Sequence, residues 1–455
     1  MDYAYPLISR CGLLLLIVFG PAAMGGVPEW SESALVMGCY AVALLHLPDF
    51  ILRRSWEGLP RLPLVILAAL LLQGWLLAAN PKYVYIDSLA RLLPLPACLN
   101  SWPGTYDREA TFRLMTRLSA FAAVFVVMLD LSRDPSWRRR ALATMGLTGI
   151  ALTAFGLSEV AVHWSGLWPQ YGHNVWPFAT YFYHGNAGAF INLAFPLVVA
   201  FTARVFFFDT HPWWRGLWAL GLAVVIAGVF VNASKAAQAV FLLLAPLCFL
   251  PWLRLLRKQV FSRTFLLRSL IVLPIFLLAV GAVLYFGDLG PALARWTQAI
   301  HQAVLVSGGR LGVARVCLRL IPYGGAWGFG PGSFTSLFPY ATWPEGNTLQ
   351  GFWRFAHEDY LQTAVEWGYV GAALWGLFLL GGIASAFFLA VKPRRQVRLR
   401  TRLLLWGTGG SLLGCALHAL VDFPLQIASI QLWVFLLAAI GWGAWSWRGE
   451  GRPHR

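Results

Sequence analysis

Three arginines in one segment form a candidate anion-binding site. Arg310 follows Ser307-Gly308-Gly309, and Arg315 and Arg319 come shortly after it. If Ser307 caps a helix, Arg310 lies in the first turn, and Arg315 and Arg319, four residues apart, share one face. Like charges at that spacing repel each other, so a nearby anion would relieve them, and the guanidinium fork suits phosphate. A solvated helix face, or anchoring to phospholipid headgroups, accounts for the pattern at least as well.

His357 is the candidate for proton transfer. It lies in the stretch Ala356-His357-Glu358-Asp359, shortly before an apolar run that begins near Gly368. Histidine is the side chain best matched to proton transfer at neutral pH. On a continuous helix, His357 would stand about 16 Å above Gly368, at or just outside the outer face of a membrane. Capping of that helix by an interfacial polar residue is the alternative.

Other polar side chains lie beside apolar runs. Lys235 stands between two such runs, where a cation is costly and often functional, although snorkelling to headgroups explains it equally well. His418 and Asp422 are four residues apart at the end of another run and could pair, but capping is the favoured interpretation. The aromatic residues of 164–183 could stack on sugars, but an interfacial aromatic belt is the interpretation that we favour for most of them.

The composition determines what must position these residues. Of the 455 residues, 58% are apolar and only 12% are charged, whereas about a quarter of a soluble chain is charged. A bilayer removes the need to cover so large an apolar core with charges, so the chain is predicted to be an all-α integral membrane protein. The net charge of +16 lies in short clusters between apolar runs, which is the pattern of membrane topology and not of a nucleic-acid partner.

Twelve stretches are long and apolar enough to span a bilayer. They lie at residues 7–26, 33–52, 62–79, 112–131, 141–161, 187–206, 216–233, 236–253, 269–287, 368–390, 403–421 and 429–447. Every second connection is rich in arginine and lysine, which predicts that these connections and both termini are cytoplasmic.

Two outer connections are long, at about 80–110 and 288–367. We therefore divide the chain into 1–287 with nine transmembrane helices, a large helical periplasmic loop at 288–367 that carries the candidate active site, and 368–455 with three more helices and the cytoplasmic C-terminus. Long loops of this kind are usually functional.

Several kinds of chemistry have no sequence signature here. The chain has no P-loop, no GxGxxG after a strand and no His/Cys cluster. The first long outer loop also lacks the Asp-x-Asp or Glu-x-Asp of metal-dependent lipid-to-protein glycosyltransferases. We therefore expect neither a cofactor nor a metal.

Together, the candidate residues resemble the bacterial O-antigen ligase and O-antigen polymerase superfamily. Its outer-loop signature is His, then Asn, Ser or Gln, nine residues, Gly, two residues, and Gly, Thr or Tyr. Here His357, Glu358, Gly368 and Gly371 have that spacing, with Glu358 in place of the amide or hydroxyl. Further stretches are similar to the family's elements, in its order: His184–Phe190 with Asn186, Ser234-Lys235 in place of Ser-Arg, Ser307–Arg310, Pro322–Phe334 and His418–Leu425.

The resemblance implies a GT-C-type glycosyltransferase that needs no metal and uses a glycan on undecaprenyl diphosphate as its donor. Arg310 and Lys235, with Arg315 or Arg319, would stabilise the diphosphate. His357 would take the proton from an acceptor hydroxyl or orient that hydroxyl. Supporting roles would go to the side chains of Glu358, Asn186 and Asp422.

The acceptor stays open among the members of that superfamily. It could be lipid A–core, as in an O-antigen ligase of lipopolysaccharide biosynthesis, which we favour. It could also be a second lipid-linked repeat, as in an O-antigen or exopolysaccharide polymerase, or a protein hydroxyl. The expected location is the bacterial inner membrane, among membrane lipids, with a periplasmic active site. A glycolipid flippase or transporter is the alternative from a different class, and a non-catalytic glycan-binding protein is a weaker one.

Overall fold

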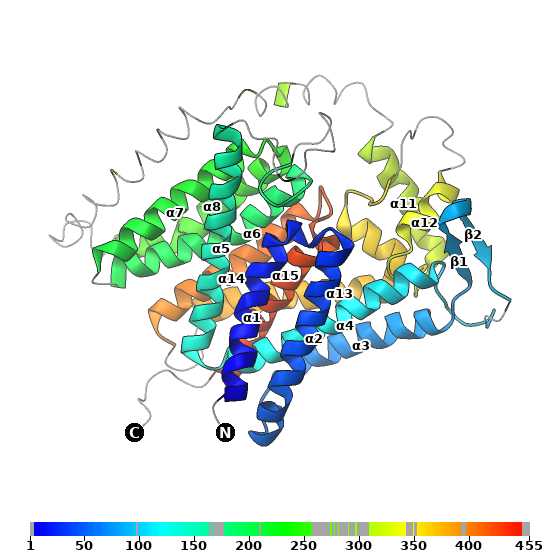
Figure 1. Ribbon diagram of the computed structural model, residues 1–455, viewed down its shortest axis with the longest axis horizontal. Coiled ribbons are helices and arrows are strands. Elements are labelled where there is room, and N and C mark those ends of the chain that lie inside the picture. The colour runs from blue at the N-terminus through cyan, green and yellow to red at the C-terminus, as the bar shows by residue number, and fades with distance from the viewer. Residues whose placement is uncertain are drawn as a thin grey trace.

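Most of the chain is helical. The computed structural model (Figure 1) describes residues 4–96, 99–162, 177–208, 211–256, 309–342, 353–392 and 397–447, with single positions at 167, 274, 277, 281, 290, 296, 297 and 349. Within these residues, nine helices are long and apolar enough to cross a membrane. The prediction of a helical bundle with many membrane-spanning segments is therefore confirmed, whereas the number of twelve spans stays a prediction.

Eleven of the predicted spans coincide with long helices. Eight of these helices precede residue 257: α1 (Ala4–Ala22), α2 (Glu29–Leu52), α3 (Arg61–Ala79), α4 (Arg108–Leu131), α5 (Pro135–Ala161), α6 (His184–Phe208), α7 (Pro212–Val231) and α8 (Lys235–Leu256). Three follow residue 358: α13 (Asp359–Val391), α14 (Leu399–His418) and α15 (Ala428–Gly443). Helix α13 begins well before the predicted start at residue 368. The predicted span 269–287 lies almost wholly outside the described residues.

Helices α6 and α15 form the centre of the bundle. In the most apolar stretch of each, 94% of the residues are buried, against 22% for α2 and 33% for α8. A helix that is apolar on all sides has to be enclosed by other helices or by lipid. Helix α6 packs against α5, α7, α8 and α14, while α15 packs against α4, α13 and α14 (Figure 1).

The first and last long helices have their chain-terminal ends on the same side of the bundle. The guanidinium of Arg10, in α1, lies 5.3 Å from the ring centroid of Trp137 at the start of α5. The indole of Trp447, which follows α15, donates to the hydroxyl of Ser132 over 3.3 Å, and Arg138 lies over its ring at 3.6 Å. This arrangement is the one that an even number of spans requires, and it is the side predicted to be cytoplasmic.

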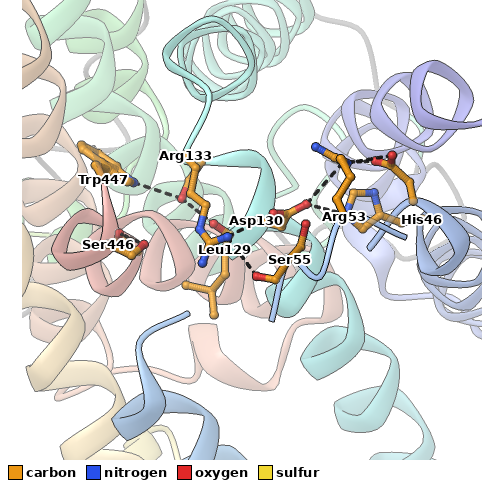
Figure 2. A network of polar contacts seen from close by, with 11 residues as sticks. His46, Arg53, Ser55, Leu129, Asp130, Arg133, Ser446 and Trp447 are labelled. Atoms are coloured by element: carbon orange, nitrogen blue, oxygen red, sulfur yellow. Dashed lines mark hydrogen bonds and ion pairs between the residues drawn. The ribbon is translucent and has the colours of Figure 1, made fainter. Parts of the chain in front are cut away.

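A buried carboxylate ties several helices together on that side (Figure 2). Asp130, near the end of α4, lies 3.1 Å from Nε2 of His46 in α2 and 3.7 Å from guanidinium nitrogens of both Arg53 and Arg133. Arg133 also donates to the carbonyl of Ser55 over 2.9 Å. Two of the arginines that predicted a cytoplasmic connection therefore also neutralise a buried charge.

The two long connections contain short elements. In the first, β1 (Tyr83–Ile86) and β2 (Arg91–Pro94) form an antiparallel hairpin, although no strand was predicted. In the second, the described residues form α11 (Arg310–Gly324) and α12 (Phe334–Ala341), and a periplasmic location of this loop stays a prediction. The hairpin lies beside α12 in Figure 1, where the backbone N–H of Leu92 donates to the Tyr340 hydroxyl over 2.8 Å.

Substitution of Asp130 by alanine should destabilise the bundle. It removes the partner of the buried His46 imidazole and the counter-charge beside Arg133, and an unsatisfied buried polar group costs about 1–3 kcal/mol. Thermal unfolding in detergent should show a clear drop in Tm. The control is Glu57→Gln, which removes the exposed ion pair with Arg54 and should cost less than about 1 kcal/mol. Equal drops for the two variants would contradict the assignment.

Candidate active site

The carboxylate of Asp422 is the centre of a polar cluster at the predicted outer face. Asp422 lies between the end of α14 and the short helix η5 (Pro424–Gln426), and it is 2% exposed. One carboxylate oxygen is 3.1 Å from Nδ1 of His357, and the other is 4.0 Å from Nη2 of Arg310. Burial opposes ionisation, but the hydrogen bond with His357 and the charge of Arg310 outweigh it, so the pKa of Asp422 lies below its ordinary value. The cluster therefore contains an ionised carboxylate at neutral pH.

The imidazole of His357 is fixed by this carboxylate and by aromatic rings. An ionised carboxylate only accepts hydrogen bonds, so Nδ1 of His357 carries the proton that it shares with Asp422. In the neutral ring, Nε2 then keeps a lone pair. The ring stands edge-on to Phe423 at 4.7 Å and to Trp353 at 5.6 Å, and 22% of the side chain is exposed. The backbone of His357 has a φ of +55°, a conformation that costs free energy and is often found at functional sites.

Arg310 is anchored on one side and exposed on the other. It is the first residue of α11, and its Nη1 donates to the carbonyl of Val421 over 2.8 Å. Its Nη2 donates to the hydroxyl of Tyr183, also over 2.8 Å. The side chain is nevertheless 48% exposed. A guanidinium that is oriented by two hydrogen bonds and remains open to solvent is suited to contact an anion.

Tyr183 joins the start of α6 to this cluster. Its ring stacks on Phe423 at 5.5 Å with an interplanar angle of 8°. Burial and the nearby Asp422 carboxylate raise the pKa of the phenol, so it stays neutral and offers its oxygen to Arg310. The sequence placed Tyr183 among the residues of an aromatic belt, and nothing in its spacing distinguishes it from its neighbours.

Glu358 and Asp359 begin α13. The side chain of Glu358 accepts from the backbone N–H of Leu361, as an N-cap does. Partial burial raises the pKa of Glu358. Asp359 accepts from the backbone N–H of Leu425 over 2.8 Å and from Nε2 of Gln426 over 2.9 Å, which ties α13 to η5. Glu358 therefore performs the capping that an asparagine or serine would perform at this position.

The glycine that follows His357 in the signature breaks α13. Gly368 has φ +65° and ψ −171° within an otherwise helical segment. Gln73, from α3, donates to the carbonyl of Trp367 over 2.7 Å at this break. The break also leaves backbone N–H and carbonyl groups of α13 without partners inside the helix. The glycine-rich turn after α11 pairs with them through four backbone hydrogen bonds: Phe329 N to Val365 O (3.1 Å), Gly330 N to Glu366 O (2.9 Å), Tyr369 N to Gly325 O (3.1 Å) and Val370 N to Ala326 O (3.1 Å).

Two predicted residues lie at the start of α6 and of the adjoining α8. Lys235 is the half-buried first residue of α8. The turn before it is held against the start of α6, because Nδ2 of Asn232 donates to the carbonyl of His184 over 3.0 Å. Asn186 is buried in the first turn of α6, and its Oδ1 has no hydrogen-bond partner among the described residues.

Three other candidates take no direct part in the cluster. Arg319 donates to the carbonyl of Ala341 in α12 over 2.9 Å, and Arg315 is exposed on α11. Arg319 lies about 13 Å along the helix axis from Arg310. His418 is buried, yet neither of its ring nitrogens has a hydrogen-bond partner among the described residues. The carboxylate of Asp422 therefore pairs with His357 and not with His418. Ser307 and Gly308 lie outside the described residues.

Glu366 is a polar residue that sequence reasoning missed. It is buried in α13 and accepts from the backbone N–H groups of Gly332 (3.0 Å) and Phe334 (3.3 Å) and from Nε2 of Gln362 (3.1 Å). Its carboxylate therefore accepts hydrogen bonds from backbone N–H groups at the start of α12. In the sequence, Glu366 looks like the last polar residue before an apolar run, and its two backbone partners lie more than thirty positions away.

Comparison with known proteins gives no relative: no family model matches the chain, and no curated protein matches its sequence. The fold and the cluster thus define a helical protein of membrane-spanning character with an Arg–Asp–His cluster.

Substitution of Gly368 by alanine should disrupt the outer part of α13. A Cβ there would lie 2.4 Å from the backbone N of Gly328 and 2.6 Å from the backbone of Ala326. The backbone conformation alone costs of order 1–3 kcal/mol for a non-glycine residue. The control is Gly376→Ala on the same helix, where a Cβ meets nothing within 4 Å. Tm in detergent should fall for the first variant and hold or rise slightly for the second; an unchanged Tm for Gly368→Ala would argue against the break.

Proposed function

We propose that the protein transfers a glycan from undecaprenyl diphosphate to an acceptor hydroxyl at the outer face of the membrane, without a metal. Ligation of O-antigen to lipid A–core is the form of the reaction that we place first. Polymerisation onto a second lipid-linked repeat, or transfer to a protein hydroxyl, would use the same cluster.

The observation that supports this proposal most is the contact of one ionised carboxylate with both a histidine and an arginine. Asp422 holds the Nδ1 proton of His357 and so leaves Nε2 to accept a proton. Arg310 lies within 4.0 Å of the same carboxylate and has exposed guanidinium surface. A base and an anion-binding group are therefore side by side.

The two groups suit the two halves of a displacement at the anomeric carbon. The acceptor oxygen forms a bond to that carbon while the bond from the carbon to the diphosphate oxygen breaks. His357 takes the proton of the acceptor hydroxyl. The leaving diphosphate gains negative charge, which Arg310 stabilises, with Lys235 as the next cation in this region. Attack opposite the leaving group inverts the anomeric configuration.

The position of the three cluster residues favours an enzyme over a flippase or transporter. Transporters place ionisable residues and broken helices near the middle of the membrane. Among the described residues, Asp422, His357 and Arg310 lie outside the long helices or at their first residue. Asp130 lies at the opposite end of the bundle, where arginines neutralise it.

The direct test is single-turnover transfer in nanodiscs from a short synthetic undecaprenyl-diphosphate glycan, with lipid A–core or a second donor as acceptor and EDTA present. His357→Ala should lower the rate by about 10²–10⁴-fold, and Arg310→Ala by about 10²–10³-fold. Arg91→Ala, which removes an exposed arginine of the outer hairpin, should act like wild type. Chain growth on the second donor would identify a polymerase. If His357→Ala is as active as wild type, or no acceptor is used, the proposed reaction is wrong.

Asp422→Asn tests how His357 is oriented. An asparagine carbonyl can still accept from Nδ1, but the charge that stabilises imidazolium and pairs with Arg310 is lost. We expect a fall in the transfer rate with little change in Tm. The limb on the acid side of the pH–rate profile should move to lower pH, because a general base has to be unprotonated and the lost charge no longer favours imidazolium. His357→Ala should remove that limb altogether. A pH profile of Asp422→Asn that superimposes on that of the wild type would contradict the role of the carboxylate.

A further inference from the structure

Two cavities adjoin one another between α2, α4, α13 and η5, apart from the Asp422 cluster. The outer cavity has a volume of about 490 Å³, and the inner one, between α4, α13 and α15, has about 170 Å³. They share Leu114, Glu366 and Gln426 in their walls. The outer volume is within the range of small-molecule sites, and the inner volume resembles apolar cavities that hold one benzene-sized group.

The two cavities differ in chemistry. The inner one is walled chiefly by apolar side chains of the membrane-spanning helices, such as Trp375, Phe378 and Phe435. The outer one is walled by charged side chains, with carboxyl groups in excess: Glu29, Glu32, Asp107, Glu109 and Glu366 against Arg113, Arg117 and Arg354. A ligand that fits both cavities has an apolar chain within the membrane and a polar head outside it.

The charges of the outer cavity determine which kind of polar head group a ligand can place there. Two of its arginines are already neutralised, because Arg113 pairs with Glu29 at 2.7 Å and Arg117 pairs with Glu32 at 2.8 Å. A diphosphate would meet an excess of carboxylates there. Hydroxyl groups suit this lining, since carboxylates accept from them and guanidinium groups donate to them.

Unpartnered polar atoms in the walls point to a bound group. Arg117 is 9% exposed, and its Nε has no hydrogen-bond partner among the described residues. Oε1 of Gln431, in the wall of the inner cavity, also has none. Buried polar groups in native proteins are normally satisfied, so hydroxyls of a ligand would complete the hydrogen bonding of both.

We propose that the two cavities bind a lipid with a sugar head, and that this glycolipid is the acceptor in the proposed transfer reaction. Its sugar occupies the outer cavity, and the part of its chain next to the head enters the inner one. The identification as the acceptor rests on the proposed function, whereas the binding of a glycolipid does not.

The position relative to His357 suits an acceptor. Phe355 lines the outer cavity and stacks on Phe423 at 4.5 Å, and Phe423 in turn contacts His357 at 4.7 Å. One pair of aromatic rings thus separates the cavity from the imidazole. A glycan of more than one sugar residue would extend past this ring pair to reach Nε2.

The test uses photolabelling of the full chain in nanodiscs with a dodecyl maltoside that carries a diazirine on its alkyl chain. Peptides from α4 and α13 around the inner cavity should be labelled, and excess unlabelled dodecyl maltoside should displace the probe. The same diazirine chain on phosphocholine should not label these peptides preferentially. Gly376→Leu, at a position where a Cβ meets open space in the inner cavity, should weaken labelling about tenfold or more. Thr335→Trp, in the wall of the outer cavity, should also weaken labelling about tenfold or more.

The matched controls are Leu377→Phe, on the exposed face of α13 beside Gly376, and Thr342→Trp, at the end of α12 away from the cavity. Both should be labelled like wild type, and all four variants should keep the wild-type Tm. Labelling that is spread over lipid-facing helices, that is unchanged by Gly376→Leu and Thr335→Trp, or that is equal for the phosphocholine probe would overturn the site. Labelling needs no donor, so a labelled cavity without glycan transfer would overturn only the transfer reaction and the acceptor role.

Discussion

The buried carboxylate of Asp422 is the hydrogen-bond acceptor on which the arrangement of the polar cluster depends. It is reached from α11 by Arg310 and from the start of α13 by His357. The start of α6 comes equally close, since a Cβ on Gly185 would lie 2.3 Å from the Asp422 carboxylate. Only a residue without a side chain allows that approach. Because an unpaired buried carboxylate would be costly, these segments, distant in the chain, must meet at one place.

The break in α13 supplies the second constraint. A continuous helix from Asp359 to Val391 would leave the turn after α11 without backbone partners. The non-helical backbone at Gly368 leaves carbonyl and N–H groups of α13 without partners in the helix, and the turn after α11 forms hydrogen bonds with them. Gly371 leaves room for Gln73, whose amide donates to the Trp367 carbonyl. The turn after α11 is therefore attached to α13, and His357 lies directly before the N-cap of that helix.

The sequence predicts the bundle well because apolar runs of about 20 residues have few alternatives to a spanning helix. It also singles out His357, Arg310 and Asp422, but not their contact, which depends on segments that meet only in the fold. The hairpin of β1 and β2 is missed because four-residue strands leave too little periodicity to detect. Tyr183 and Glu366 are missed for another reason. Their roles come from hydrogen bonds to residues far along the chain, and neither has a neighbour in sequence that signals it.

The Asp422 cluster and the outer cavity carry opposite excess charge, and this separation matters for the proposed reaction. In that reaction the exposed guanidinium of Arg310, with Lys235 on a neighbouring element, would attract a diphosphate, whereas the carboxylates around the outer cavity would repel one. A donor and a glycan acceptor that both carry sugars could otherwise exchange places. The ring pair of Phe355 and Phe423 lies between the two regions. A lipid diphosphate in the acceptor position would therefore lack the cations of the Asp422 cluster and would lie next to carboxylates, which repel it. Selection between the two sugar-bearing lipids thus follows from repulsion as much as from attraction.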